Sequence, residues 1–277
     1  MSGIQNIYIG KMKEIYTEEL KRIQLDILSD IDKFCEKEHI TYFLAYGTLL
    51  GAVRHQGFIP WDDDIDIAMP RPDYDKFIRH YNSQNTEHEK AYRVISSVTD
   101  IDYGLPFAKV YDSRTSMNEY LYRQENYGVY IDVFPIDGVQ RNLRQIPRAL
   151  KWGKMLNTKK AIIGGGRSMG KNLIMLLGKI VLWPISKKRI LKKIDTIATA
   201  VDYQDAQEVA CVAAPYSERD VVNKSAIHTT VKADFEGRQF PIPVGYDVYL
   251  RHIYGDYMQL PPVEKRVSTH TFKAWWK

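Results

Sequence analysis

The stretch IPWDDDIDIAM, residues 59–69, places four aspartates within five positions of an otherwise apolar run. Neighbouring carboxylates repel one another, and a buried carboxylate without a partner is costly in free energy. The apolar residues around the aspartates predict a buried strand over residues 62–69. A chain with this segment must therefore bring a positive partner to it, either from elsewhere in the sequence or from solution.

The spacing of these aspartates indicates the kind of partner. Alternate side chains of a strand point to the same face, so we expect Asp62, Asp64 and Asp66 to share one face. Two or three carboxylates arranged in this way suit Mg²⁺ or Mn²⁺, which bind carboxylates, water and phosphates. The alternative is an acidic strand on the surface, but Ile65 and Ile67 make the segment too apolar for solvent on both faces. The sequence therefore favours a divalent metal site.

A small Gly-Thr turn precedes the aspartates by roughly 16 residues. Gly47 and Thr48 fall between a predicted strand, 41–47, and a helix predicted to begin at Thr48, where free N–H groups can accept a phosphate. Arg54, beyond this short helix, either reaches a phosphate or ends the helix in solvent. The Gly-Thr turn followed by alternating aspartates is similar to the arrangement in nucleotidyltransferase folds, in which the turn holds phosphates and the aspartates hold metal.

Such a fold needs a third carboxylate on a neighbouring strand. Asp132 supplies one, because it lies in the middle of YGVYIDVFP, a predicted apolar strand over residues 127–135. The alternative for Asp132 is a strand-end cap or a salt bridge to a lysine. Lys109 is a lone cation in LPFAKVYD, residues 105–112. It is either a structural partner for one of the aspartates or a phosphate-binding residue.

Charge divides the chain into unlike parts. Fifteen of the 39 Lys and Arg residues lie between Val139 and Ile194, where there is no Asp or Glu, so the rest of the chain is acidic. This block predicts a basic helical insertion or membrane-facing subdomain at 139–200, between a catalytic core at 1–138 and its C-terminal part at 201–277. Strands with intervening helices predict an α+β fold, with a mixed sheet flanked by helices.

The apolar residues indicate where the chain works. The longest apolar stretch, 172–185, contains Lys179 and is shorter than the roughly 20 residues that a membrane-spanning helix needs. The two distant cysteines, Cys35 and Cys211, fit a reducing compartment. We therefore expect a cytoplasmic chain that docks on the inner face of the cytoplasmic membrane through residues 139–193. The alternative is that the apolar stretch packs on the core.

Four segments of the sequence resemble the LicD family of phosphocholine transferases, of which the fukutin-related proteins are more distant members. The segments are YFLAYGTLLGAVRHQGFIPWDDDIDIAMPRPDYDKF, FAKVYD, YIDVFPIDG and FEGRQFPIPVGYDVYLRHIYGDYMQLPP. The resemblance implies a nucleotidyltransferase-like core that uses a divalent metal. It also implies transfer of a phospho-alcohol from a CDP-alcohol, such as CDP-choline, to a sugar hydroxyl. That sugar would belong to a lipid-linked glycan such as a teichoic acid precursor.

Position by position, the resemblance makes Asp64 and Asp66 the metal-binding pair, Gly47 and Thr48 the phosphate-binding turn, and Asp132 the third acidic residue. Asp132 would either complete the metal site or take the proton from the acceptor hydroxyl. The number of metals and the alcohol stay open.

Two other functions compete with this interpretation. A nucleotidyltransferase that moves a nucleoside monophosphate and releases pyrophosphate would use the same carboxylates. A binding protein for nucleic acid is less favoured, because the acidic segment would repel a polyanion.

Overall fold

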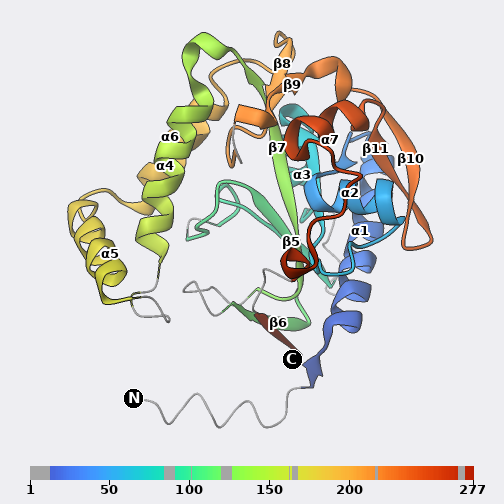
Figure 1. Ribbon diagram of the computed structural model, residues 1–277, viewed down its shortest axis with the longest axis horizontal. Coiled ribbons are helices and arrows are strands. Elements are labelled where there is room, and N and C mark those ends of the chain that lie inside the picture. Colours follow the sequence, from blue (N-terminus) through green and yellow to red (C-terminus); the bar gives the residue numbers. More distant parts are fainter. Residues whose placement is uncertain are drawn as a thin grey trace.

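A seven-stranded mixed sheet forms the centre of the protein, so the expected α+β fold is confirmed (Figure 1). The computed structural model describes residues 13–83, 91–100, 102–119, 127–161, 163, 168–215, 218–267 and 272–277. The helices are α1 Thr17–Glu38, α2 Tyr46–His55, α3 Arg71–His80, α4 Gln145–Lys160, α5 Met169–Val181, α6 Lys187–Ala198 and α7 Tyr246–Tyr254.

The central sheet has the strand order β2-β3-β7-β5-β4, with β8 paired to the far end of β7 and β9 paired to β8. The β3–β7 pair is parallel and the other pairs are antiparallel. These strands are β2 Phe43–Leu44, β3 Asp66–Pro70, β4 Tyr92–Ile95, β5 Ala108–Asp112, β7 Tyr130–Val139, β8 Glu208–Ala210 and β9 Val222–Asn223.

Two smaller sheets complete the described strands. One joins β1 near the start of the chain to β12 near its end, with β6 on the other side of β12, and the other is a hairpin. Their strands are β1 Glu14–Ile15, β6 Thr115–Glu119, β12 Phe272–Trp276, β10 Thr230–Phe235 and β11 Arg238–Pro243.

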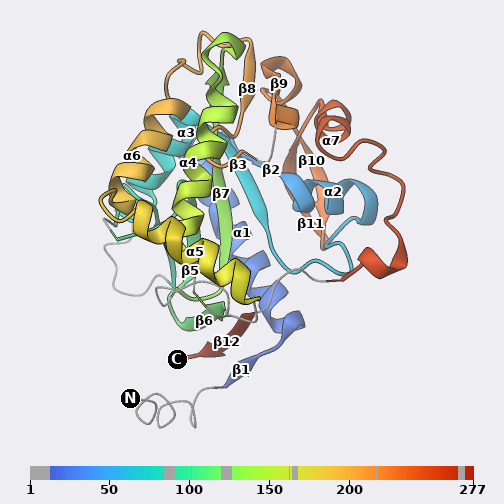
Figure 2. The same ribbon diagram turned by 60° about the vertical axis from the view of Figure 1, so that its left-hand side comes forward.

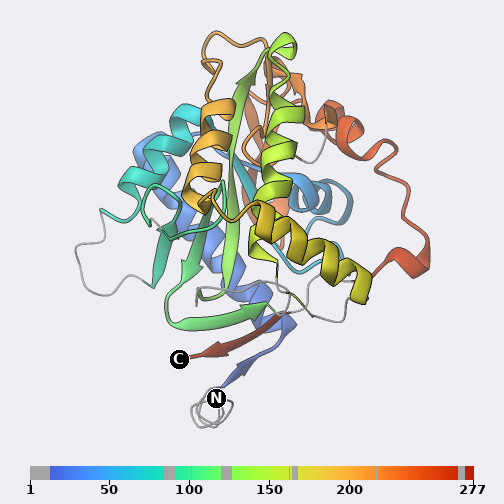
Figure 3. The ribbon, with the colours of Figure 1, turned by 90° about the vertical axis from the view of Figure 1, so that its left-hand side faces the viewer.

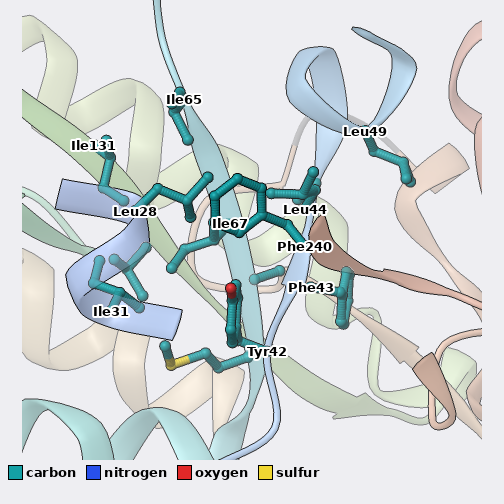
Figure 4. Close-up of a cluster of buried hydrophobic side chains, with 14 of the residues drawn as sticks. Leu28, Ile31, Tyr42, Phe43, Leu44, Leu49, Ile65, Ile67, Ile131 and Phe240 are labelled. Carbon is teal, nitrogen blue, oxygen red and sulfur yellow. The ribbon is translucent and has the colours of Figure 1, made fainter. Parts of the chain in front are cut away.

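Helix α1 packs on the sheet through one apolar stripe. Its buried side chains recur every three or four residues, which places them on a single helix face. Figure 4 shows Leu28 and Ile31 of α1 beside Ile67 of β3 and Ile131 of β7, within the main hydrophobic core. The helix ends at His39, whose left-handed backbone conformation lets its N–H bond the last turn. This packing leaves the opposite face of β3 and β7 free to carry polar residues.

Residues 145–198 form a second region made of three helices (Figure 2). Helices α4 and α6 share a separate small core, which includes Ile146 of α4 and Ile190 and Ile194 of α6. Helix α5 joins them but contributes no buried residue. The segment between Val139 and Ile194 is thus helical over most of its described length, as expected, while its status as a separate unit stays a prediction.

The predicted strand over residues 62–69 is wrong at its start. The strand β3 begins at Asp66, and residues 62–65 approach it outside any regular element. A turn in which the Asp62 N–H donates to the Ile59 carbonyl, at 2.8 Å, leads into this segment. Three adjacent carboxylates repel one another and are better solvated in a loop than in a paired strand. Asp62 and Asp64 therefore do not follow the strand alternation that was expected of them.

Candidate active site

Three charged residues stand in one row across three neighbouring strands. Asp66 of β3 is in register with Asp132 of β7, and Asp132 is in register with Lys109 of β5. Residues in register on neighbouring strands have their side chains close together on the same face. The sheet thus brings together residues that lie far apart in the sequence.

Lys109 is a positive partner of the carboxylate on β7. Its Nζ lies 2.5 Å from Oδ1 of Asp132, and only 8% of its side chain is exposed. The same nitrogen lies 3.3 Å from the ring centre of Tyr130, so an aromatic face further stabilises the cation. The structure therefore places Lys109 as a partner of Asp132, which is one of the two roles expected from the sequence.

The alternation along β7 explains why Asp132 faces this site. Ile131 and Val133 are fully buried in the main core, whereas Tyr130, Asp132 and Phe134 are only partly buried. Since successive side chains of a strand point to opposite faces, the three partly buried residues share the face turned away from the core. Packing of the apolar face on α1 thus fixes the direction in which Asp132 points.

Gly47 lies against the acidic loop. A Cβ atom added at Gly47 would stand 2.8 Å from Oδ2 of Asp62, so a side chain here would require the Asp62 carboxylate to move. The glycine therefore lets the start of α2 approach the Asp62 carboxylate. The loop and the turn predicted from the sequence are neighbours in the structure, although Asp62 and not Asp64 makes this contact.

Thr48 ties the turn to the start of β3. Its buried Oγ1 accepts a hydrogen bond of 2.8 Å from the Asp66 N–H. The expectation that Thr48 begins the helix as its cap is wrong, because α2 begins at Tyr46 and Ala45 occupies the cap position. Ala45 also donates its N–H to the Asp66 carbonyl at 3.0 Å. Two bonds from this segment thus hold Asp66 in place, and phosphate binding by Gly47 and Thr48 stays a prediction.

The electrostatics of the site show an excess of negative charge. Burial raises the pKa of Asp66 well above its ordinary value, and the nearby carboxylates of Asp64, Asp132 and Asp62 raise it further. Lys109 acts in the opposite direction but does not outweigh them. Four carboxylates and one ammonium therefore share a largely buried space, which favours the uptake of a further positive charge.

This donor set fits a divalent cation such as Mg²⁺. Within the described ranges, no three His, Cys, Asp or Glu side chains converge closely enough to enclose a metal by themselves. Mg²⁺ does not require such a cage, because it binds one or two carboxylates and keeps positions for water and substrate phosphates. Asp64 and Asp66 would hold it, with Asp132 beside them. The raised pKa of Asp66 is the observation that supports this fit.

A cluster of positive side chains lies at the C-terminal end of α2, away from Gly47. Arg54 donates from Nη1 to the Tyr257 carbonyl at 2.5 Å, and its pKa is lowered by burial and then by the neighbouring charge of Arg266. The guanidinium of Arg266 lies 5.6 Å from the ring centre of Trp61, and His55 contacts the same tryptophan edge-on. Neither arginine has a carboxylate within salt-bridge distance among the described residues.

This cluster connects to the acidic loop through Trp61, which precedes Asp62 in the chain. Arg54 itself lies seven residues along α2 from Gly47, about 10 Å. The sequence-based prediction included Arg54 but not Arg266. The only signal for Arg266 was its place in a tail of Pro and charged residues, which gives no information on where the tail folds back.

Half-buried aromatic rings surround the charged row. The ring of Phe134 lies 4.5 Å from that of Phe107 and 5.3 Å from that of Tyr46. Phe134 follows Asp132 by two residues on the same strand face, and Phe107 precedes Lys109 by two. The carboxylates and the ammonium therefore stand beside an aromatic surface contributed by β7, α2 and the residue before β5.

Comparisons with known proteins agree with this geometry. Residues 39–146 match the family model described as LicD/FKTN/FKRP, nucleotidyltransferase domain. The lipopolysaccharide cholinephosphotransferase LicD of Haemophilus influenzae is 29% identical over 275 residues, which cover 95% of this chain and 99% of that protein. Uncharacterised proteins of Rickettsia typhi and Rickettsia prowazekii are 42% identical over 65 residues and 49% identical over 47 residues, about a fifth of each protein.

The matched range contains the whole carboxylate row, the turn at Gly47 and Lys109. The longer similarity also spans the helices α4 to α6. Residues 39–146 are therefore similar to the LicD/FKTN/FKRP nucleotidyltransferase domain, and the chain as a whole is similar to a LicD protein.

Proposed function

We propose that this enzyme transfers phosphocholine from CDP-choline to a sugar hydroxyl of a cell-surface glycan precursor and releases CMP. The observation that carries the proposal is the row of Asp66, Asp132 and Lys109, with Asp64 beside it, in a chain similar along 95% of its length to a cholinephosphotransferase. Phosphoryl transfer depends mainly on positioning and on stabilising negative charge, which a divalent cation held by these carboxylates would supply.

The reaction forms one bond and breaks one. The acceptor oxygen attacks the phosphorus that carries choline, the bond from that phosphorus to the CMP oxygen breaks, and the acceptor proton leaves. A divalent cation held by Asp64 and Asp66 would neutralise charge on the donor diphosphate. Asp132 either completes that metal site or takes the acceptor proton, while Lys109 holds its carboxylate in place.

The aromatic surface supports choline as the alcohol. A quaternary ammonium has no N–H to donate and is bound by the faces of aromatic rings. Phe107 and Phe134 are partly exposed beside the carboxylate row, where the alcohol of a bound donor would have to lie. Glycerol or ribitol would instead require several hydrogen-bonding partners in this place.

The acceptor and the location follow from the charge of the chain. We place the enzyme in the cytoplasm, on the inner face of the cytoplasmic membrane, with residues 139–193 against the lipid. There it would meet a lipid-linked acceptor, such as a precursor of teichoic acid or lipopolysaccharide. Within the described residues, no helix has the length and hydropathy needed to span a bilayer.

A donor screen tests the proposal. The purified enzyme is incubated with Mg²⁺, a sugar acceptor and CDP-choline, CDP-glycerol or CDP-ribitol in turn, and CMP and pyrophosphate are measured. We expect CMP release with CDP-choline and less than about a tenth of that rate with the other donors. Pyrophosphate release from a nucleoside triphosphate would instead support the alternative nucleotidyltransferase. In either case, we expect the activity to require a metal that EDTA can remove.

A further inference from the structure

Helix α5 exposes apolar side chains that helices of globular proteins usually bury. None of its residues is buried, and its apolar residues are largely open to solvent: Leu173, Ile174, Leu176, Leu177, Ile180 and Val181. Trp183, two residues beyond the helix, is 84% exposed. An exposed apolar surface of this size in a chain rich in charge marks an interaction site.

The orientation of α5 makes this exposure systematic. The side chains that are partly covered are Asn172, Met175, Lys179 and Leu182, which recur at helical spacing and include two of the three polar residues of the helix. A Cβ at Gly178 would stand 3.0 Å from Cγ2 of Thr158, so this is the side that meets α4. The helix therefore turns its more polar side to the protein and its apolar side to solvent, the reverse of the usual arrangement.

The charge around α5 indicates what covers the apolar side. Fifteen Lys and Arg residues and no Asp or Glu lie between Val139 and Ile194. Lys187, Lys188 and Arg189 are exposed in the first turn of α6, immediately after Trp183. A second copy of this chain would bring the same positive charge against itself, whereas an anionic lipid surface would neutralise it. The charge thus favours lipid over self-association.

We propose that α5 and Trp183 lie in the interface of an anionic lipid bilayer, with Lys187, Lys188 and Arg189 on its headgroup phosphates. The helix, about 20 Å long, would lie along the surface with its apolar side among the acyl chains and would not cross the bilayer. The proposal deepens the proposed function, on which it rests only for the lipid-linked nature of the acceptor.

The fold places α5 at the end of the sheet that carries the charged row (Figure 3). Gln145 at the start of α4 bonds the Gly138 carbonyl near the end of β7, and α4, about 24 Å long, then diverges from this strand (Figure 1). Asp132 lies six residues back along β7 from Gly138, about 20 Å. At the end of α4, Lys160 approaches Gly104 in the segment before β5. A bilayer held by α5 would therefore lie on the side of the carboxylates.

Vesicle flotation tests the proposal without any measurement of activity. The variant Leu177→Gln/Ile180→Gln removes apolar side chains that are 54% and 59% exposed, and Val231→Gln/Val248→Gln removes two that are 48% and 49% exposed on β10 and α7. We expect wild type and the control to float with phosphatidylcholine vesicles that contain phosphatidylglycerol. The affinity of the α5 variant for these vesicles should be lower by about tenfold or more. Its melting temperature and circular dichroism spectrum should be unchanged.

A charge variant and a fluorescence measurement separate the two parts of the contact. Lys187→Glu/Lys188→Glu/Arg189→Glu should lose binding by a similar factor, and wild-type binding should fall with added salt and on pure phosphatidylcholine. Lipids with brominated acyl chains should quench the fluorescence of bound wild type. In Trp183→Phe this quenching should fall while the protein still floats.

The contrary outcomes are equally specific. Equal flotation of wild type and the α5 variant, no flotation of wild type, or unaltered quenching in Trp183→Phe would each overturn the proposal. So would a wild-type dimer in analytical ultracentrifugation that the α5 variant converts to a monomer, since a second copy would then cover α5. Release of CMP with a soluble acceptor should not differ between wild type and the α5 variant. If neither protein releases CMP while wild type still floats with the vesicles, the proposed function is rejected and the membrane contact of α5 is not.

Discussion

The central sheet and the helical segment 145–198 depart from the usual distribution of side chains in opposite directions. In the sheet, Asp66, Asp132 and Lys109 are charged residues within or beside a tightly packed apolar core. In the helical segment, α5 leaves apolar residues in solvent among many lysines. Each departure costs folding free energy, because charge is desolvated in one place and apolar surface is hydrated in the other.

The difference teaches what each region is prepared to bind. The carboxylates of the site outnumber the single ammonium of Lys109, and a cation would supply further positive charge. The exposed apolar side of α5 lacks an apolar neighbour, and the lysines and arginines around it lack negative charge. An anionic bilayer would supply the apolar contact and the negative charge. Binding should therefore stabilise each region, through cations at the sheet and lipid at α5, and the two effects should be separable by mutation.

Removal of a carboxylate from the row should have the largest effect. Asp64→Asn and Asp66→Asn should each lower kcat/KM on the order of a thousandfold, because a lost ligand weakens the hold on the metal that stabilises the transferring phosphate. The metal-free variants should be as stable as wild type or more so, since repulsion is relieved. Initial rates at saturating Mg²⁺ and thermal melts in EDTA measure both. Near-normal activity of either variant would remove that residue from the metal site.

The pH dependence of stability provides the control for Asp66. Burial and the neighbouring carboxylates raise the pKa of Asp66, so the folded chain binds this proton more tightly than the unfolded chain does. The resulting stabilisation is fully present at pH below the ordinary aspartate pKa and is lost as pH rises through the raised value. In EDTA, the melting temperature of wild type should therefore fall relative to that of Asp66→Asn as the pH rises. Parallel curves would contradict the assigned shift.

Asp132→Asn should lower the transfer rate about a hundredfold or more, and it separates two roles for this residue. If Asp132 is the base, the variant should still bind Mg²⁺ and CDP-choline with wild-type affinity. If it is a ligand, metal affinity should fall as well. Isothermal titration of metal and donor distinguishes these outcomes, and circular dichroism and thermal melts check that the variant is folded. Unchanged transfer would exclude Asp132 from the site.

The same substitution in the two regions should affect stability very differently. Leu28→Ala, in the core beneath the sheet, should lower the free energy of unfolding by about 3 kcal/mol, because it leaves a cavity in a fully buried place. Leu177→Ala on α5 should change it by less than about 0.5 kcal/mol in the absence of lipid. Urea unfolding with equal m-values measures the pair. A large loss in Leu177→Ala would mean that α5 packs on the protein in solution.

The smallest effect is expected at the rim of the site. Arg54→Met and Arg266→Met should each raise the KM for the nucleotide donor about tenfold with little change in kcat, if the pair binds its phosphates before the reaction. Arg238→Met is the matched control, since this arginine pairs with Asp26 on α1. Equal KM values in all three variants would show that the Arg54–Arg266 pair does not bind the donor.

Much of the site could be predicted because unusual residues stand in regular patterns. Asp132 and Lys109 are single charges within apolar strands, so the sequence indicates both the strands and a specific role for each charge. Apolar residues recur at helical spacing over residues 11–38, which predicts a helix there. The structure describes this range from residue 13 onward and begins α1 at Thr17.

The rest depends on contacts that no local pattern contains. The start of β3 is set by repulsion among three carboxylates and by hydrogen bonds from the start of α2 to Asp66, which join separate segments. Arg266 contacts Trp61 only because the C-terminal tail folds back onto a segment about two hundred residues earlier in the sequence. The apolar pattern of α5 is equally compatible with a buried helix, and only its packing on α4 reveals that the apolar side faces out.

The parallel pairing of β3 with β7 has a consequence for synthesis of the chain. Asp66 and Asp132 become neighbours only through a crossover that contains α3, β4, β5 and β6. A nascent chain that ends before Tyr130 already displays the acidic loop but has neither the third carboxylate nor the strand that positions Lys109. Such long-range parallel pairings form late in folding. A growing chain on the ribosome should therefore complete the proposed metal site only after β7 has emerged.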